Sequence, residues 1–284
     1  MAVFYNYATL SYNQNVTNSN VVTGELVEVI TVTKNAVASG YRAGDTITYV
    51  VNVINSGNSA YNNLTLTDNL GAYPIGGTSR VPLTYIDGSV QYYVNGVLQA
   101  APVVSASGTA LTVSGINVPA DSNVAIIYRV NVNEFAPLAA GSTITNTASI
   151  SGTGITTVTA TETLPVLEEA FLTISKALNP TTVVENEPLT YTFVISNTGN
   201  TAAVAADNVV LTDTFAPALD IISVTYNGTA WASPANYTYD PATGVFSTVA
   251  GQITVPAAVY TTDPATGAVS VTPGTTVITV TGTI

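Results

Sequence analysis

The chain has 284 residues, of which 46% are hydrophobic and only 8% are charged, so it has enough apolar material for the cores of two ordinary domains. Its formal net charge of -12 and its sequence pI near 4.1 exclude polyanions such as nucleic acid, and anionic membrane surfaces, as partners. Cys and His are both absent, which excludes disulfides, thiolate metal sites and the usual general base of hydrolytic enzymes.

The pattern along the chain is that of β-strands. Runs of Val, Ile, Thr and Tyr alternate with polar residues and are interrupted by Asn-Gly, Ser-Gly and Pro, without a long stretch at helical spacing. No apolar run reaches the roughly eighteen residues that a membrane helix needs, so we expect no membrane insertion. The first residues lack the basic and apolar regions of a signal peptide, so the sequence does not indicate the export route. The sequence predicts an all-β protein.

The first predicted element is an N-terminal strand. Its residues Phe4, Asn6, Ala8 and Leu10 share one face, because side chains alternate along a strand. A linker then leads to residue 27, so we assign residues 1–27 to an N-terminal strand and linker.

Two copies of one domain follow. Residues 44–58 (GDTITYVVNVINSGN) have their echo in residues 186–200 (NEPLTYTFVISNTGN). A strand that ends on a lysine precedes each copy of this segment, at 30–34 and 172–176, and a Leu-Thr-Asp strand end follows each copy. The repeats predict two tandem domains, over residues 28–166 and 167–284.

These matched strands, the Asn-Ser/Thr-Gly-Asn turns and the closing strand Ile144–Ile150 resemble the conserved-repeat, immunoglobulin-like domain of Gram-positive surface proteins. Domains of that family occur in tandem, and their function is unknown. The resemblance covers nearly the whole chain and implies two immunoglobulin-like β-sandwiches that form part of a stalk or fibre. It also implies an extracellular location on a cell or spore surface, although fold alone does not establish function.

The two copies differ at their C-terminal ends. Copy one continues from a strand at 124–132 to the closing strand, whereas copy two ends at 276–284, the counterpart of 124–132. Residues 4–11 match residues 144–151, with Asn and Ala at the same offsets, and the two linkers that follow match loosely. We infer that the N-terminal strand is a closing strand displaced from its own domain.

A sandwich without a terminal strand exposes an apolar groove and unpaired backbone groups, and both invite strand addition from another chain. A donor at one end and an acceptor at the other give a heterologous contact, which builds an open filament unless it closes a ring. The expected partner is therefore another copy of this chain, joined head to tail by donor-strand complementation. The alternative is that the chain was cut from a longer repeat array and that both ends are ragged.

Lysine occurs at only two positions, Lys34 and Lys176, and both occupy the same place in the repeat. Strand alternation puts Lys34 on the inward face, and it does the same for Asp68 and Asn146 of copy one. Burial disfavours the charged forms of an amine and a carboxyl, which leaves a neutral amine nucleophile beside a carboxyl that can shuttle protons. The amine can then attack the Asn side-chain carbonyl and release ammonia.

This chemistry resembles the autocatalytic Lys–Asn isopeptide bonds of pilin and adhesin domains of the collagen-adhesin type. The resemblance implies that Lys34, Asp68 and Asn146 act as nucleophile, proton shuttle and electrophile in copy one. In copy two, Lys176 and Asp213 would use Asn6 of the next molecule. The alternative is that each trio is a buried, hydrogen-bonded ion pair capped by Asn. Neither hypothesis makes the chain an enzyme, beyond a single-turnover reaction on its own side chains.

A second functional class is an adhesive or carbohydrate-binding stalk, with a surface glycan of unknown identity as its partner. A face for such a ligand could be lined by aromatic residues, although these are also common in strands and cores. The candidates are Tyr41, Tyr85, Tyr92, Tyr93 and Trp231. The acidic residues lack the spacing of a calcium loop, so we predict no metal and no cofactor.

Overall fold

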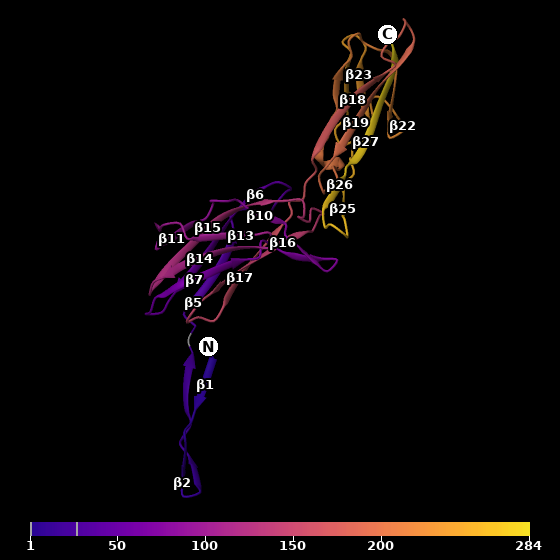
Figure 1. Cartoon of the computed structure of the whole chain (residues 1–284). Coiled ribbons are helices and arrows are strands. Elements are labelled where there is room, and N and C mark those ends of the chain that lie inside the picture. The colour runs from indigo at the N-terminus through magenta and orange to yellow at the C-terminus, as the bar shows by residue number, and fades with distance from the viewer. Residues whose placement is uncertain (1, 27) are drawn as a thin grey trace. The chain divides into compact units, whose positions relative to one another are not determined.

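The computed structural model describes residues 2–26 and 28–284; the outer limits of the expected N-terminal segment, residues 1 and 27, lie outside the described residues. The chain is all-β, as predicted, and in the described part its only helix is the short 3₁₀ helix η1 (Ala205–Asp207). It forms two compact units, Met1–Ala136 with Ile144–Leu164, and Pro137–Thr143 with Pro165–Ile284 (Figure 1). None of the described helical residues forms a helix long and apolar enough to cross a membrane.

The first unit contains two antiparallel sheets. One has the strand order β12-β11-β15-β6-β5, with β10 also paired to β15, and the other has the order β13-β14-β7-β16-β17. The strands of the first sheet are β5 (Ile30–Ala36), β6 (Thr46–Asn55), β10 (Leu83–Tyr85), β11 (Gln91–Val94), β12 (Val97–Leu98) and β15 (Ser122–Val132). Those of the second are β7 (Tyr61–Asp68), β13 (Val103–Ser107), β14 (Ala110–Val118), β16 (Thr143–Ser151) and β17 (Val158–Pro165), and a small hairpin is made by β8 (Tyr73–Ile75) and β9 (Thr78–Arg80).

Strand alternation builds the core of this unit. In β6 the buried residues are Ile47, Tyr49, Val51, Val53 and Asn55, while their neighbours are more exposed. The facing sheet buries alternate residues of β7, β14 and β16 in the same way. The side chains that point between the sheets therefore set which groups can meet in the interior.

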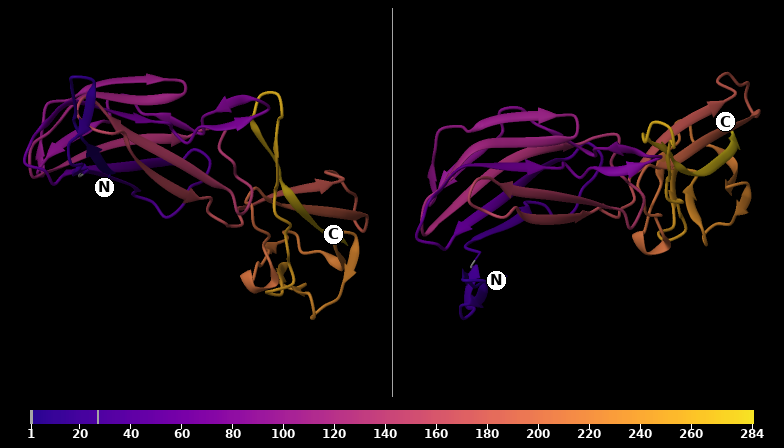
Figure 2. Two further views of the ribbon diagram at one scale, coloured as in Figure 1. Left: turned by 90° about the horizontal axis from the view of Figure 1, so that it is seen from below. Right: turned by 60° about the horizontal axis from the view of Figure 1, so that its bottom comes forward.

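The second unit has one larger and one smaller sheet, and Figure 2 gives further views of its strands. The sheet orders are β18-β19-β27-β21-β22 and β20-β24-β23, and β25 and β26 form a separate hairpin. The strands are β18 (Leu172–Asn179), β19 (Pro188–Asn197), β20 (Thr212–Thr214), β21 (Asp220–Tyr226), β22 (Thr229–Trp231), β23 (Tyr237–Asp240), β24 (Val245–Thr248), β25 (Val259–Thr262), β26 (Val269–Thr272) and β27 (Gly274–Thr283).

The repeat in the sequence corresponds to a repeat in the structure. Asn55 donates its amide to the carbonyl of Ser59 at 2.8 Å, and Asn197 donates to the carbonyl of Thr201 at 2.7 Å. In both units the glycine two residues later donates its backbone N–H to the same Asn side chain. The two units thus build one turn twice, at the end of β6 and of β19.

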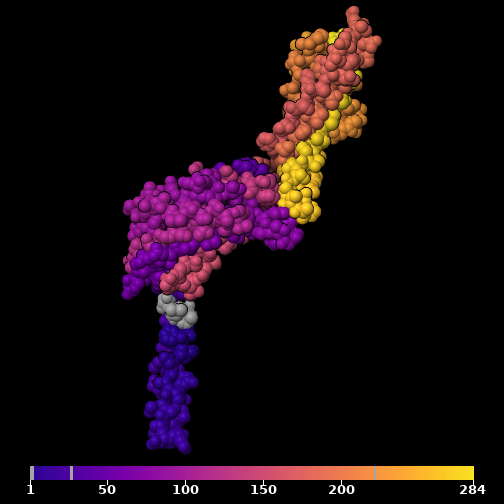
Figure 3. Space-filling model, viewed as in Figure 1, coloured from indigo at the N-terminus to yellow at the C-terminus, as the bar shows by residue number. Residues whose placement is uncertain are grey.

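The N-terminal residues 2–26, which we call the arm, form a two-stranded ribbon. The sequence predicts one strand over residues 4–11, but the structure divides it into β1 (Ala2–Asn6) and β2 (Thr9–Tyr12). These pair with β4 (Val22–Leu26) and β3 (Asn15–Asn18), which the sequence assigned to a linker. The chain reverses at Asn13 and Gln14, which both have positive φ. In the space-filling view of Figure 3 the arm is the narrow indigo ribbon.

The units differ at one sheet edge. In the first unit β7 lies between β14 and β16, and β17 follows β16 at the edge. In the second unit the repeat counterpart of the end of β7 is β20, which pairs with β24 on one side. Within the described chain no strand flanks its other side.

Candidate functional site

Lys34 and Asp68 meet in the core of the first unit. Lys34 lies on β5 and Asp68 ends β7, so the two residues come from facing sheets, and their side chains form a direct ion pair with 0% of either exposed. Tyr128, on β15, donates its hydroxyl to the same carboxylate oxygen, Oδ2. The other oxygen, Oδ1, accepts the backbone N–H of Leu70 at 2.9 Å. Cation, phenol and amide together satisfy the buried carboxylate, which makes its burial tolerable.

Burial also changes the acidity of the groups around this carboxylate. Loss of solvent lowers the pKa of Lys34 from its ordinary value near 10.5 to about 8, against the opposing attraction of Asp68. The Lys34 Nζ lies 4.6 Å from the ring centroid of Tyr49. Burial raises the pKa of both Tyr49 and Tyr128, with Asn146 acting in the opposite direction. Burial therefore shifts the Lys34 amine toward its neutral form.

Asn146 lies on β16 and is fully buried beside this pair. Its Oδ1 accepts the backbone N–H of Gly71 at 3.2 Å, whereas its Nδ2 has no hydrogen-bond partner among the described residues. Gly71 has a φ of +73°, and a Cβ there would come within 2.7 Å of the Ile144 side chain. The turn after β7 thus holds both Asp68, through Leu70, and the Asn146 carbonyl, through Gly71.

The second unit repeats the ion pair in a more open setting. Lys176 on β18 and Asp213 on β20 form a direct ion pair, but 40% of the lysine side chain and 19% of the aspartate side chain are exposed. The Lys176 Nζ lies 4.5 Å from the ring centroid of Tyr191 and 5.3 Å from that of Phe215. Asn6, the expected third member, lies exposed on β1 of the first unit. The described chain therefore brings together two members of this trio and not the third.

An apolar groove lies on the surface of the second unit next to this ion pair. It has a volume of about 170 Å³ and is lined by Leu172, Thr173, Ile174, Ile195, Val209, Val210 and Leu211. Ile174 is 55% exposed there. In the first unit the matching residues Ile30, Leu64 and Leu66 are buried, Val32, the counterpart of Ile174, is half-buried, and β16 pairs alongside β7. The groove therefore lies beside the sheet edge that corresponds, by the repeat, to the edge that β16 covers in the first unit.

Sequence reasoning missed the two tyrosines of the first centre. Tyr49 and Tyr128 pair across β6 and β15 and stack at 5.8 Å between ring centroids. Their inward positions could be counted from strand alternation, but tyrosine in a strand is ordinary core material and indicates no chemistry. In the second unit Tyr191 takes the place of Tyr49, and it pairs with Val280 where Tyr49 pairs with Tyr128. The second centre therefore has no phenol in the place of Tyr128.

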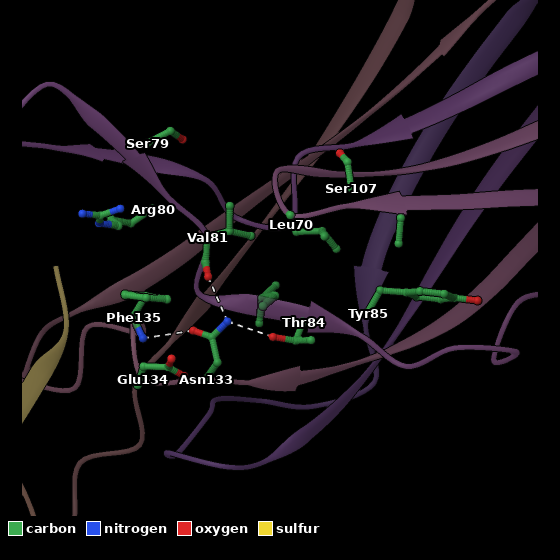
Figure 4. Close-up of a pocket in the computed structure, with 13 residues that line it drawn as sticks. Leu70, Ser79, Arg80, Val81, Thr84, Tyr85, Ser107, Asn133, Glu134 and Phe135 are labelled. Carbon is green, nitrogen blue, oxygen red and sulfur yellow. Dashed lines mark hydrogen bonds between the residues drawn. The ribbon is translucent and has the colours of Figure 1, made fainter. Parts of the chain in front are cut away.

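A hollow in the first unit has a volume of about 470 Å³. Figure 4 shows Asn133 in its wall, donating to the Val81 carbonyl and to the Thr84 hydroxyl, both at 2.9 Å. Both amide hydrogens of Asn133 are thus bonded to groups in the wall of the hollow, and the side chain stabilises that wall.

Not all of the aromatic residues considered for a glycan face lie at the surface. Tyr41 and Tyr92 are buried. Trp231 belongs to the second unit, where it stacks on Tyr226 at 4.8 Å.

No protein-family model matches this chain, and the search of curated proteins gives no match. Among solved structures, a 35 kDa C-terminal fragment of the major pilin of Streptococcus agalactiae matches with a TM-score of 0.38 and 12% identity, over 78% of this chain and 79% of that one. The major pilin subunit of Bacillus cereus gives 0.35 and 13%, over 95% and 73%. The collagen-binding subdomain of an Enterococcus faecalis surface protein gives 0.32 and 9%, over 50% and 99%. At such values the similarity concerns the fold alone, so function has to be inferred from the site.

Proposed function

We propose that this chain is a structural subunit of an extracellular fibre or surface appendage, on a cell or spore surface, that polymerises head to tail by donor-strand complementation. The observation that supports it most is the open edge of β20 with its apolar groove, at the position that β16 closes in the first unit. Unpaired strand edges and apolar grooves are the two features that strand addition uses. The donor is the N-terminal strand of the next subunit.

The first unit supplies the expected register. There Ala148 pairs with Asp68, and Ile150 with Leu66. By the repeat offsets, Ala8 of one subunit would pair with Asp213 of the next, which sets Asn6 toward the acceptor's lysine. A one-residue slip would turn the donor's apolar face outward, so the register is strongly specified. Each large apolar side chain buried would stabilise the contact by roughly 1.5–3 kcal/mol before ordering costs.

A covalent bond would lock the two sheets of the first unit together. The neutral Lys34 Nζ attacks Asn146 Cγ and forms a new C–N bond. The Asp68 carboxyl takes a proton from Nζ and delivers it to Nδ2, the old C–N bond breaks, and ammonia leaves. The Gly71 N–H, which donates to Asn146 Oδ1, stabilises the negative charge that develops on that oxygen. The product is an amide that joins the two sheets, and no oxidant or reductant is consumed.

The same step at the second unit would join subunits. Lys176 would attack Asn6 of the docked subunit with Asp213 as the proton shuttle, again with loss of one ammonia for each bond. Each centre consumes its own side chains, so the reaction runs once and the chain is not an enzyme for external substrates.

The test compares one substitution at the two repeat positions, Lys34→Met and Lys176→Met, because methionine keeps the stem volume and removes the nucleophile. Wild-type monomer is expected to be one ammonia lighter than its sequence and to form a boiling-resistant ladder on denaturing gels. Lys34→Met should keep the ladder and regain the full monomer mass. Lys176→Met should lose the ladder and keep the light monomer.

Other outcomes separate the parts of the proposal. Full monomer mass and no ladder, with filaments visible by electron microscopy, would remove the crosslinks and leave reversible strand donation. Monomers without filaments at any concentration would contradict polymerisation itself, and this is the result expected of a stalk module or of a segment of a longer array.

A further inference from the structure

The element that closes the first unit is a hairpin and not a single strand. β17 pairs with β16 and forms the edge of the sheet. The side chains of Thr145 and Thr163 meet at 3.2 Å, and those of Thr147 and Thr161 at 2.9 Å. These two contacts define one antiparallel register for the hairpin. The second unit has a counterpart of neither strand among its described residues.

The arm has the same construction. β1 matches the first half of β16 and pairs antiparallel with β4, so that Phe4 lies opposite Gly24 and Asn6 opposite Val22. We propose that the arm docks as an intact two-stranded hairpin, extending the sheet β23-β24-β20 of the next copy first by the β1–β2 side of the arm and then by its β3–β4 side. The resulting order corresponds to β13-β14-β7-β16-β17 of the first unit. This inference rests on the proposed function and specifies its donor.

Side-chain volume across the hairpin supports an intact donor. The register of the first unit sets Leu164 opposite Ile144, and both are buried. In the arm the corresponding pair is Phe4 and Gly24, and the Phe4 ring lies over the glycine, since a Cβ there would be 2.3 Å from Phe4 Cζ. The arm thus pairs the large side chain of Phe4 with a glycine, where the first unit pairs the two intermediate-sized side chains of Ile144 and Leu164. The ring occupies this position only while β4 stays paired.

Backbone hydrogen bonding also favours docking of the intact hairpin. Each strand of a two-stranded ribbon has one paired and one unpaired edge. The unpaired edge of the β1–β2 side of the arm, around Ala8, can join the unpaired edge of β20 while β1 remains bonded to β4 and β2 to β3. A single-strand donor would first have to break the β1–β4 and β2–β3 pairings. The hairpin mode gains hydrogen bonds at the contact without losing any in the arm.

In the docked state, β4 of the arm would also change the side chains that surround Lys176 and Asp213. In the first unit the register sets Glu162 opposite Asn146, and its carboxylate raises the pKa of Lys34 by attraction. The arm presents Val22 opposite Asn6. A docked hairpin would therefore cover the second centre with an apolar side chain where the first has a carboxylate.

A disulfide across the arm tests the inference in the full chain. Tyr5 and Thr23 face each other on β1 and β4, on the opposite face from Phe4 and Asn6, and the protein has no native cysteine. The double variant Tyr5→Cys, Thr23→Cys is oxidised as monomer, and filament growth is followed by light scattering with and without reductant. We expect oxidised and reduced protein to polymerise at rates within about twofold of each other, because docking opens no pairing. Oxidised protein that is slower by about tenfold or more, and is restored by reductant, would overturn the hairpin and keep single-strand donation.

A second variant acts without the disulfide. Thr23→Pro weakens β4 and leaves the donor strand unchanged, with Thr23→Ala as its control. Hairpin docking predicts slower growth for the proline variant than for the alanine variant, whereas single-strand docking predicts faster growth because the donor is released. If wild-type protein forms no filaments either, polymerisation itself fails, and that result is distinct from both.

Discussion

At the scale of single residues, the first centre depends on how a lysine is held in a core. Removal from water disfavours the ammonium form of Lys34, and this effect outweighs the attraction of Asp68, so the pKa falls to about 8. A lysine paired with a carboxylate at the surface would not become a nucleophile near neutral pH. The facing sheets of the unit supply both the dry surroundings and the proton acceptor.

We expect crosslinking in the first unit to accelerate with pH and to level off above about pH 8, because only the neutral amine attacks and the pKa of Lys34 is about 8. Uncrosslinked protein, isolated denatured, is refolded at a series of pH values, and loss of ammonia is timed by intact mass. A rate that does not change between about pH 6 and 9 would contradict Lys34 as the titrating nucleophile.

The two tyrosines of this centre provide a matched pair of substitutions. Tyr128→Phe removes a hydrogen bond to a buried carboxylate, so we expect it to destabilise the first unit by about 1.5–3 kcal/mol and to slow crosslinking. Tyr49→Phe removes a buried hydroxyl that has no partner among the described residues, so its stability should stay within about 0.5 kcal/mol of wild type or rise. Denaturant unfolding in an Asn146→Ala background measures both stabilities, and timed loss of ammonia by intact mass, with Asn146 in place, measures the crosslinking rate of Tyr128→Phe. Equal losses would show that the hydrogen bond to Asp68 contributes nothing specific.

At the scale of elements, the two units show the same sheet edge, covered by β16 in the first unit and left open by the described strands in the second. With β16 in place, Ile30 of β5 and Leu64 and Leu66 of β7 are buried; in the second unit the corresponding segments line a groove in which Ile174 is 55% exposed. In the sequence this difference corresponds to the closing strand of copy one, whose match lies at residues 4–11 and not in copy two. The sequence did not show that the two halves of the arm pair with each other as a hairpin, because Asn13-Gln14 is not the Asn-Gly pair that marks most tight hairpins.

We expect Ile174→Lys to leave the monomer folded, with a change in unfolding free energy of no more than about 0.5 kcal/mol, because the side chain is exposed. The same variant should abolish polymerisation, since a charge would then enter the donor's apolar interface. Val259→Lys, at a residue 63% exposed on the separate hairpin β25–β26, is the control and should polymerise normally. Filaments from both variants would show that the groove is not the acceptor.

At the scale of the whole molecule, the proposed contact uses different surfaces at its two sides. Such heterologous contacts propagate into open assemblies, whereas a contact that uses the same patch on both partners closes as a dimer. The crosslinks would then run along the fibre, so that pulling would load covalent bonds between successive subunits.

Mixing two defective chains tests this polarity. A chain without its first 26 residues keeps the acceptor and lacks the donor, and the Ile174→Lys chain keeps the donor and lacks the acceptor. Each alone should remain monomeric, and together they should form a 1:1 heterodimer and nothing larger, because neither can extend further. Sedimentation velocity measures the species. Longer assemblies in the mixture, or dimers of either chain alone, would contradict a single head-to-tail contact.

The sequence by itself determined the all-β class, the two copies of one domain and the inward placement of Lys34 and Asp68. These follow from alternation along a strand and from repetition along the chain, both of which are local patterns. Only the tertiary structure decided that Tyr128 shares the Asp68 carboxylate, that the Gly71 N–H holds Asn146, and that a hairpin closes the first unit. Those contacts join strands far apart in the sequence, and their selection depends on which sheets face each other and on what remains uncovered.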